Sequence, residues 1–194
     1  MNGHTHALFG VATVTLANSI HPFIAPHLWQ DVPTGATLAL SAGIIGALLP
    51  DIDANESSIK HEMGLAGSVI SGGLHLFGVK HRGMTHTGLA AAVIWLAAAI
   101  IGKHFDFPDI GLAFGLGYAS HLIADGMTLT GIPLLTPFYR KNIHLLPKPL
   151  RVRTGSAVES LVFLLVALGL AGLLPKTFAP ETQWLRQWLS LVGK

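Results

Sequence analysis

The residues of this 194-residue sequence whose types and spacing could do chemistry are histidines and aspartates at the edges of apolar segments. Asp51 and Asp53 directly follow one such segment, and Pro50 helps to end the preceding helix because proline disfavours helical geometry in the residue before it. His121 and Asp125 are four residues apart, a spacing that places both side chains on one face of a helix. With histidines beside two other segments included, the candidate donors come from four predicted helix ends: His6, Asp51, Asp53, His81, His86, His121 and Asp125.

The chemistry that this donor set predicts is metal binding through nitrogen and oxygen. The sequence contains no cysteine, which excludes a thiolate site, a disulfide framework and a cysteine nucleophile. Imidazole suits zinc, iron and related metals, whereas carboxylate suits harder ions and can bridge two of them. We therefore expect a mono- or dinuclear centre that holds a divalent metal, zinc first and manganese or iron as alternatives, with Asp51 or Asp125 as the bridging carboxylate.

Three residues are the expected catalytic groups: Asp53, Arg82 and His86. A centre of this kind activates water and stabilises the negative charge that develops during hydrolysis. Arg82 and the basic stretch 140–153 would hold a phosphate or another anionic group through charge-assisted hydrogen bonds.

The segments that must position these donors are strongly apolar. Hydrophobic residues make up 51% of the sequence and charged residues 11%, which is too apolar for an ordinary soluble domain. A membrane-spanning helix takes about 20 apolar residues, a length that only the last run reaches without its flanks. We expect an all-α, multi-span transmembrane helical bundle with helices over the runs 7–20, 36–50, 88–102, 110–124 and 157–174, and a re-entrant or interfacial helix over 64–79.

The expected organisation is one integral membrane domain over residues 1–194, with the metal site at one end of the bundle. No signal peptide is expected, because the first Lys or Arg of the sequence is Lys60. With five spans, most Lys and Arg residues lie on the side of the two long loops, so the positive-inside tendency places these loops and the metal site in the cytoplasm. The net charge of +2 is small for a nucleic-acid-binding protein, and we expect no direct nucleic-acid binding.

Local signals predict helix ends and helix contacts. Thr85 is a good N-cap residue for the third predicted helix. Ser156 and Glu159 fit a capping box before the last run, with a role of Glu159 beside the site as the alternative. Gly111 and Gly115 would let two helix backbones approach closely.

Each candidate donor also has a purely structural interpretation. The aspartates after Pro50 could form a solvated turn, since Asp is common in turns. His121 and Asp125 could satisfy each other inside the bundle, and the histidines before the third run could be interfacial. The other histidines have no partner at ligand spacing, and we expect them at surface or interfacial positions: His21, His27, His61, His75, His104 and His144.

Three strings contain most of these donors: Leu-Leu-Pro-Asp51-Ile-Asp53, His81-Arg-Gly-Met-Thr-His86-Thr and Gly117-Tyr-Ala-Ser-His121-Leu-Ile-Ala-Asp125. The string Gly131-Ile-Pro-Leu-Leu-Thr-Pro137 follows them. They resemble the YdjM family, which is described as inner-membrane, metal-dependent hydrolases with a LexA-binding member. The likeness runs over residues 6–159. It implies a multi-pass inner-membrane protein whose metal-linked hydrolase activity is carried by Asp51, Asp53, His81, His86, His121 and Asp125.

A looser similarity of the histidine and aspartate set to zinc-dependent phospholipase C and the P1-type nucleases favours phosphoester chemistry. The leading hypothesis is therefore a membrane-embedded hydrolase of phosphoester bonds in a lipid or another anionic substrate. One alternative is a membrane-bound regulatory or tethering protein that binds a soluble partner, such as a repressor, through the basic stretch 140–153. Another is a transporter whose carboxylates and imidazoles relay protons or ions. The same basic stretch could bind anionic lipid of the bilayer.

Overall fold

The computed structural model describes residues 1–24, 35–51 and 84–177. Two 3₁₀ turns, η1 (Leu49–Asp51) and η2 (Lys148–Leu150), accompany the α-helices. The β-pairing within the described residues is limited to isolated bridges. The expectation of an all-α chain therefore holds for the described residues, and each of the five apolar runs lies largely within one helix. The helices are α1 (Gly3–Ile24), α2 (Gly35–Leu48), α5 (Gly88–His104), α6 (Pro108–Gly126) and α7 (Ala157–Thr177).

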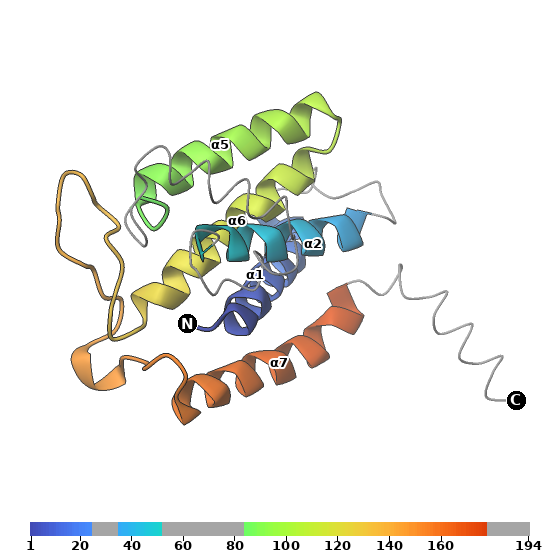
Figure 1. Cartoon of the computed structure of the whole chain (residues 1–194). Coiled ribbons are helices and arrows are strands. Elements are labelled where there is room, and N and C mark those ends of the chain that lie inside the picture. Colours follow the sequence, from blue (N-terminus) through green and yellow to red (C-terminus); the bar gives the residue numbers. More distant parts are fainter. Residues whose placement is uncertain (25–34, 52–83, 178–194) are drawn as a thin grey trace, which may run out of the picture.

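Helix α6 is the centre of the bundle (Figure 1). It packs against α1, α2 and α5, while α7 packs against α1. A Cβ atom at Gly117 would lie 2.0 Å from the carbonyl oxygen of Gly43 in α2, and one at Gly111 would lie 2.6 Å from that of Ala98 in α5. Gly111 and Gly115, predicted to allow close helix approach, both lie against α5. The helix axes are thus close enough that only glycine fits at these contacts.

Helix α5 begins one residue after Thr87, which is its N-cap. The hydroxyl oxygen of Thr87 accepts a hydrogen bond of 3.1 Å from the backbone N–H of Ala90. The predicted N-cap, Thr85, is wrong by two residues, because a cap side chain must reach the first helical turn. The carbonyl of Thr85 instead accepts a hydrogen bond from the buried Tyr118 hydroxyl of α6, and this contact ties the segment before α5 to the central helix.

The expected multi-span transmembrane architecture is wrong. Among the described residues, none of the helices combines the length and the hydropathy that crossing a bilayer requires. Helices α2 and α5 have 14 and 17 residues, fewer than the about 20 that a span takes. Histidines near the start of α1, and His121 and Asp125 in α6, interrupt the apolar character of the other two long inner helices. The cytoplasmic placement of the loops depended on those spans and has no support. The segment 64–79 lies outside the described residues.

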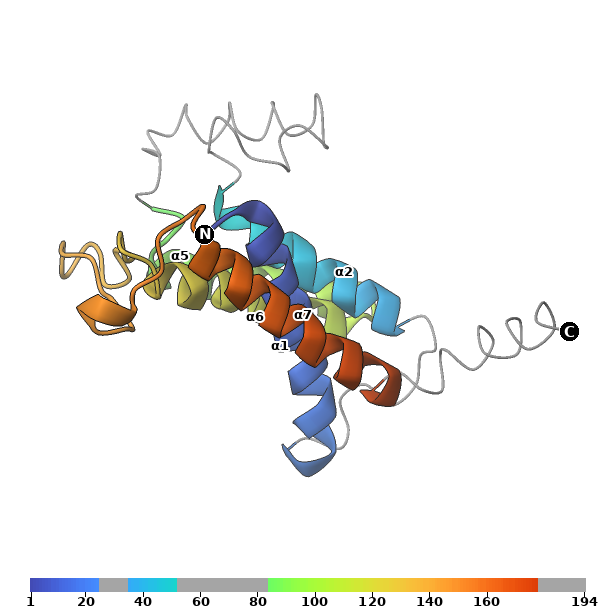
Figure 2. The same ribbon diagram turned by 90° about the horizontal axis from the view of Figure 1, so that it is seen from below.

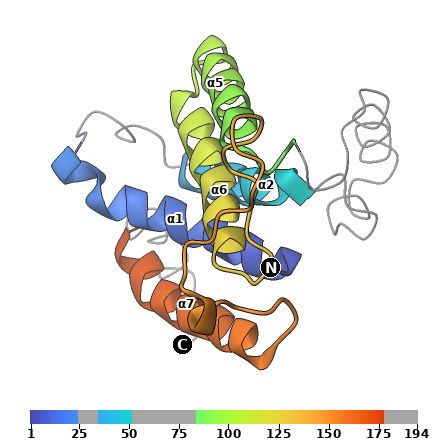
Figure 3. The same cartoon turned by 90° about the vertical axis from the view of Figure 1, so that its left-hand side faces the viewer.

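One end of the bundle gathers several chain segments. The N-terminus, the end of α2 with η1, the start of α5, the end of α6 and the start of α7 all lie there (Figures 1 and 2). The connection from α6 to α7, which we call the 127–156 loop, projects from the same end and faces the viewer in Figure 3. Five of the predicted donors therefore reach one end of the molecule from four separate parts of the chain.

Replacement of Gly117 by alanine tests the packing of α6. The added methyl group would meet the backbone of α2, which cannot move aside as a side chain can, so we expect Gly117→Ala to lower the free energy of unfolding by about 3 kcal/mol or more. Gly169→Ala in α7 is the matched control, because nothing lies within 4 Å of its added Cβ and alanine favours a helix by up to about 1 kcal/mol. Urea unfolding of both purified variants measures the difference. Equal stabilities would contradict the close contact of α6 with α2.

Candidate metal centre

Helix α6 supplies two buried donors, His121 and Asp125, one helical turn apart. Nδ1 of His121 lies 2.7 Å from the carbonyl oxygen of Ala47, near the end of α2. Because a carbonyl can only accept, Nδ1 carries the proton and Nε2 keeps its lone pair. Metal-binding histidines are usually oriented in this way, by a hydrogen bond from the nitrogen that does not bind the metal. His121 is therefore held with Nε2 directed toward the other donors.

His86 approaches the same place from the turn before α5, and it is 2% exposed. Its Nε2 lies 3.1 Å from Nε2 of His121 and 3.4 Å from Oδ1 of Asp51. Its Nδ1 lies 3.1 Å from the hydroxyl oxygen of Thr85. The lone pairs of Nε2 of His86 and Nε2 of His121 would repel each other at this distance. A proton on one of the two nitrogens, or a cation bound to both, removes this repulsion.

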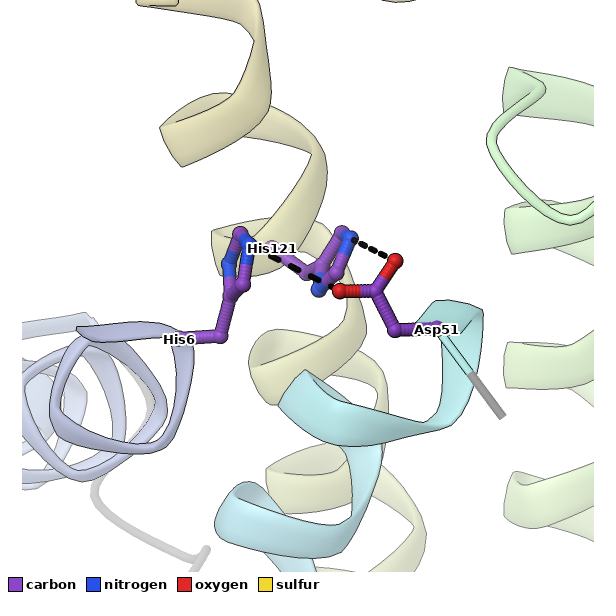
Figure 4. Close-up of side chains that lie close together, drawn as sticks. All are labelled: His6, Asp51 and His121. Carbon is purple, nitrogen blue, oxygen red and sulfur yellow. Dashed lines mark ion pairs between the residues drawn. The ribbon is translucent and has the colours of Figure 1, made fainter. Parts of the chain in front are cut away.

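His6 of α1 and Asp51 of η1 complete the cluster, as Figure 4 shows for these two residues and His121. The His6 ring stacks on that of His121 with the ring centroids 3.7 Å apart. Nε2 of His6 lies 3.2 Å from Oδ1 of Asp125, but neither of its ring nitrogens makes a hydrogen bond although the residue is fully buried. A buried polar atom without a partner is costly, and a bound cation is one partner that would satisfy it.

The two carboxylates each face two groups of imidazole nitrogens. Oδ2 of Asp51 lies 4.0 Å from Nε2 of His6, whereas Oδ1 lies 3.4 Å from His86 and 3.9 Å from His121. Oδ1 of Asp125 faces His6, and Oδ2 lies 3.7 Å from both other histidines. Donor atoms of His6, Asp51 and His121, and of His86, His121 and Asp125, lie within 4.8 Å of one another. This part of the chain could hold a metal ion.

The environment keeps both carboxyl groups ionised. Burial by itself raises the pKa of Asp51, but the hydrogen bond from His86 and electrostatic interactions with the neighbouring His121 and His6 rings outweigh burial and lower the pKa to about 2. Burial likewise raises the pKa of Asp125, and the contact with His6, followed by the charge of the N-terminal amino group, lowers it well below its usual range. Both groups therefore carry negative charge at neutral pH.

The environment keeps His121 neutral. Burial, and next the neighbouring His6, lower its pKa to about 3, against the opposite effect of the Asp51 and Asp125 carboxylates. A histidine that binds a metal ion must be neutral, and the His121 ring has this protonation state at neutral pH without any metal.

Glu159 of α7 accepts a hydrogen bond from the residue before α1 and thereby holds the start of that helix in place. Its Oε1 accepts a 2.6 Å hydrogen bond from the backbone N–H of Asn2, and its Oε2 accepts one of 2.7 Å from Gly155. Burial raises the pKa of Glu159, but these two N–H groups and the Thr5 hydroxyl outweigh burial, so its pKa lies below its usual value. The capping box forms in part, because the Ser156 hydroxyl accepts from the N–H of Glu159 while the carboxylate bonds elsewhere. Glu159 thus positions the turn that carries His6.

The structure brings five of the seven predicted metal-binding residues together: His6, Asp51, His86, His121 and Asp125. The other two, Asp53 and His81, and the predicted catalytic residue Arg82, lie outside the described residues. Sequence reasoning did not find the Ala47 carbonyl or the clamp by Glu159 on Asn2. Any residue at position 47 has a backbone carbonyl, so the residue type there does not predict the contact with His121. Glu159 and Asn2 are 157 residues apart, and no local pattern in the sequence predicts that they pair.

Comparison with known proteins gives the family of the chain. The model of the family described as YdjM inner membrane protein matches residues 1–178, which contain all seven predicted donors. The chain belongs to the YdjM family. It is 33% identical over 164 residues to the uncharacterized protein YvsG of Bacillus subtilis, a match that covers 84% of this chain and 87% of the relative.

Two further family relatives are named inner membrane protein YdjM, one from Escherichia coli and one from Shigella flexneri. Each is 30% identical over 141 residues, which cover 71% of this chain and 66% of the relative. No solved structure matches the chain. The comparisons therefore place the chain in the YdjM family, and none of these relatives is named for an enzymatic activity.

The pKa of His121 predicts acid sensitivity of the metal-free protein. Between pH 6.5 and about 3, the unfolded ring binds a proton that the folded ring does not, so unfolding is favoured as the pH falls. The free energy of unfolding should decrease by about 1.4 kcal/mol per pH unit from this residue. Asp51 adds a loss in the same direction below pH 3.8, as the pH falls toward its folded pKa of about 2.

Urea unfolding at neutral pH and near pH 5, with a chelator present, measures this slope. His121→Gln should flatten it, whereas His104→Gln, at an exposed residue at the far end of α5, should keep the wild-type slope. A wild-type unfolding free energy that is equal at the two pH values would contradict a buried neutral His121.

Glu159→Gln tests the clamp on α1. An amide offers one acceptor oxygen in place of two and no charge, so one of the two backbone hydrogen bonds is lost and His6 is less well positioned. We expect the zinc affinity to fall about tenfold, as for other groups that support metal ligands. Ser160→Ala, one residue away at an exposed position, is the control and should keep the wild-type affinity. Zinc titration calorimetry compares the two, and an unchanged affinity of Glu159→Gln would refute the positioning role.

Proposed function

We propose that the chain is a metal-dependent hydrolase that acts on phosphoester bonds of a lipid or another anionic substrate. One observation carries the proposal: three imidazoles and two carboxylates from α1, η1, α6 and the turn before α5 converge at one end of the bundle. Buried ionisable groups are expensive unless they are paired or bind metal. A set of nitrogen and oxygen donors without sulfur suits zinc, manganese or iron.

The orientation of the carboxylates favours two metal positions. Asp51 and Asp125 each direct one oxygen toward His6 and the other toward the pair of His86 and His121. His6 with one oxygen of each carboxylate would hold one cation, and the histidine pair with the other two oxygens would hold a second. Asp53 and His81, predicted for the same site from the sequence, are the candidates for further ligands.

A divalent cation bound there would supply Lewis-acid activation of water and stabilisation of negative charge on a phosphate. The protein residues hold and orient the donors. Ala47 fixes the proton of His121 on Nδ1, and Glu159 fixes the turn of His6. The side chain of Asp51 is 23% exposed, more than those of the other four residues, so water and substrate would enter beside Asp51. Arg82 stays the predicted group for binding the anionic substrate.

The family name supports an inner-membrane location for this activity, because the matching family and the Escherichia coli relative are both named inner membrane proteins. Phospholipid headgroups contain the phosphoester bonds on which such a centre would act. A lipid phosphoester is therefore the substrate class that agrees with both the donor set and the family name.

Metal analysis of the full chain tests the proposal. Purified in detergent without chelator, the wild-type protein should contain about two equivalents of divalent metal per chain, as in other dinuclear sites. His6→Gln should lose the metal at the His6 position, and His121→Gln should lose the metal at the position of His86 and His121, so each variant should keep about one equivalent. Both variants should lose hydrolysis of a phosphodiester such as bis(p-nitrophenyl) phosphate. The control His104→Gln changes an exposed histidine at the other end of α5 and should keep metal and activity.

The outcomes separate the parts of the proposal. Wild-type protein that lacks divalent metal, even after incubation with zinc, manganese and iron, would refute the metal centre. Metal that remains bound in full after His121→Gln would place the binding site elsewhere. Metal-loaded protein without phosphodiesterase or phospholipid hydrolysis would refute the enzymatic assignment and leave the centre intact.

A further inference from the structure

The 127–156 loop carries charge of one sign. Residues 126–158 contain no Asp or Glu. Arg151 uses its Nε–H in a 3.1 Å hydrogen bond to the carbonyl of Leu146. The other basic side chains of the loop are exposed, and in the ranges that the structure describes none has a carboxylate partner. They are Arg140, Lys141, Lys148 and Arg153.

The same loop exposes large apolar side chains between these charges. Phe138 is 91% exposed, Leu150 63% and Leu135 51%, and Tyr139 and Leu145 are about half exposed. Phe138 and Tyr139 directly precede Arg140 and Lys141 in the sequence. Apolar side chains beside Lys and Arg are typical of surfaces that lie in the headgroup region of a bilayer, where the rings enter the lipid and the cations meet phosphate.

The exposure of Phe138 is a property of an ordered loop. The backbone N–H and carbonyl groups of Ile132 and Ile143 bond to each other at 3.0 and 2.7 Å. Leu134 accepts a 2.7 Å hydrogen bond from Gly88 at the start of α5. Ile132 is 2% exposed, so the loop has its own buried anchor while its tip presents Phe138 outward.

We propose that the 127–156 loop is a docking surface for the anionic headgroup region of a lipid bilayer. The positive charge of the loop favours an anionic partner, and the exposed aromatic rings favour a partner with an apolar layer beneath its charged surface. A bilayer has both properties. The loop directly follows α6, and the Thr128 hydroxyl donates to the Asp125 carbonyl at 2.7 Å, so this surface and the metal centre lie at the same end of the bundle (Figures 1 and 3).

The docking surface does not depend on the proposed hydrolase activity. Its charges and rings lie outside the donor cluster, and lipid contact by the loop is measured without any turnover. Failure of the metal centre would leave the docking surface intact, and failure of docking would leave the metal centre intact.

The absence of cysteine allows a direct test on the full chain, because one introduced cysteine takes a single fluorophore. Phe138→Cys and Phe105→Cys, labelled with an environment-sensitive dye, place the dye at the loop tip and at an exposed position between α5 and α6. Each labelled protein is reconstituted with phosphatidylcholine vesicles that contain or lack phosphatidylglycerol, and brominated lipids report contact of the dye with the acyl region.

We expect the dye at position 138 to shift to shorter wavelength and to be quenched by brominated lipid only when phosphatidylglycerol is present. Charge reversal by Arg140→Glu with Lys141→Glu should reduce this quenching about tenfold. Lys103→Glu, near the far end of α5, is the matched charge control and should leave the quenching unchanged. The dye at position 105 should not respond to phosphatidylglycerol.

Three results would overturn the proposal. They are a dye at position 138 that stays water-exposed in both kinds of vesicle, equal quenching with and without phosphatidylglycerol, and quenching that survives the double charge reversal. The first excludes lipid contact by the loop tip, and the other two exclude recognition of anionic headgroups by its basic side chains. A soluble protein partner for the loop would produce the first result.

Discussion

The contacts of Asp51 and Asp125 with three imidazoles are the interaction on which the rest of the structure depends. Two ionised carboxylates in one buried cluster need hydrogen-bond donors or cations as partners. Here each carboxylate has one oxygen beside His6 and the other beside His86 and His121. Because these donors come from four separate chain segments, satisfying their charge also fixes the positions of α1, α2, α5 and α6 relative to one another.

The helix packing makes that convergence possible. Helix α6 carries two donors and must approach its neighbours closely enough for theirs to reach it. Glycines at the contacts allow this, since the carbonyl oxygen of Gly43 lies where a side chain at position 117 would begin. The same closeness brings the Ala47 carbonyl to Nδ1 of His121. Backbone packing therefore sets both the position of His121 and the ring nitrogen that carries its proton.

Much of the helical layout could be predicted from the sequence, and so could the membership of several residues in one cluster. Apolar runs bounded by polar residues place the helices, and the four-residue spacing of His121 and Asp125 places both on one face of α6. Asp51 follows Pro50 at the end of α2 as the proline signal predicts. These features depend on residues close together in the sequence, through helix periodicity and the effect of proline on the helix end.

Other features depend on contacts between distant segments, and sequence reasoning missed them or was wrong. Apolar composition suggested membrane spans, but composition does not fix helix length, and α2 and α5 have 14 and 17 residues, fewer than the about 20 that a span takes. The N-cap is Thr87, whose hydroxyl oxygen accepts from the N–H of Ala90. Thr85 lies two residues too early, and its carbonyl accepts from the Tyr118 hydroxyl, a contact across 33 residues. Glu159 has the spacing of a capping residue, and only the folded chain shows that its carboxylate reaches Asn2.

The most direct test of the central claim is the X-ray absorption spectrum at the zinc K-edge of protein loaded with zinc. A centre built from His6, His86, His121 and the two carboxylates predicts nitrogen and oxygen neighbours at about 2.0–2.2 Å, with the outer-shell scattering of imidazole rings and no sulfur. A shell of oxygen neighbours alone, without imidazole scattering, would mean that zinc binds away from the histidines and would contradict the account.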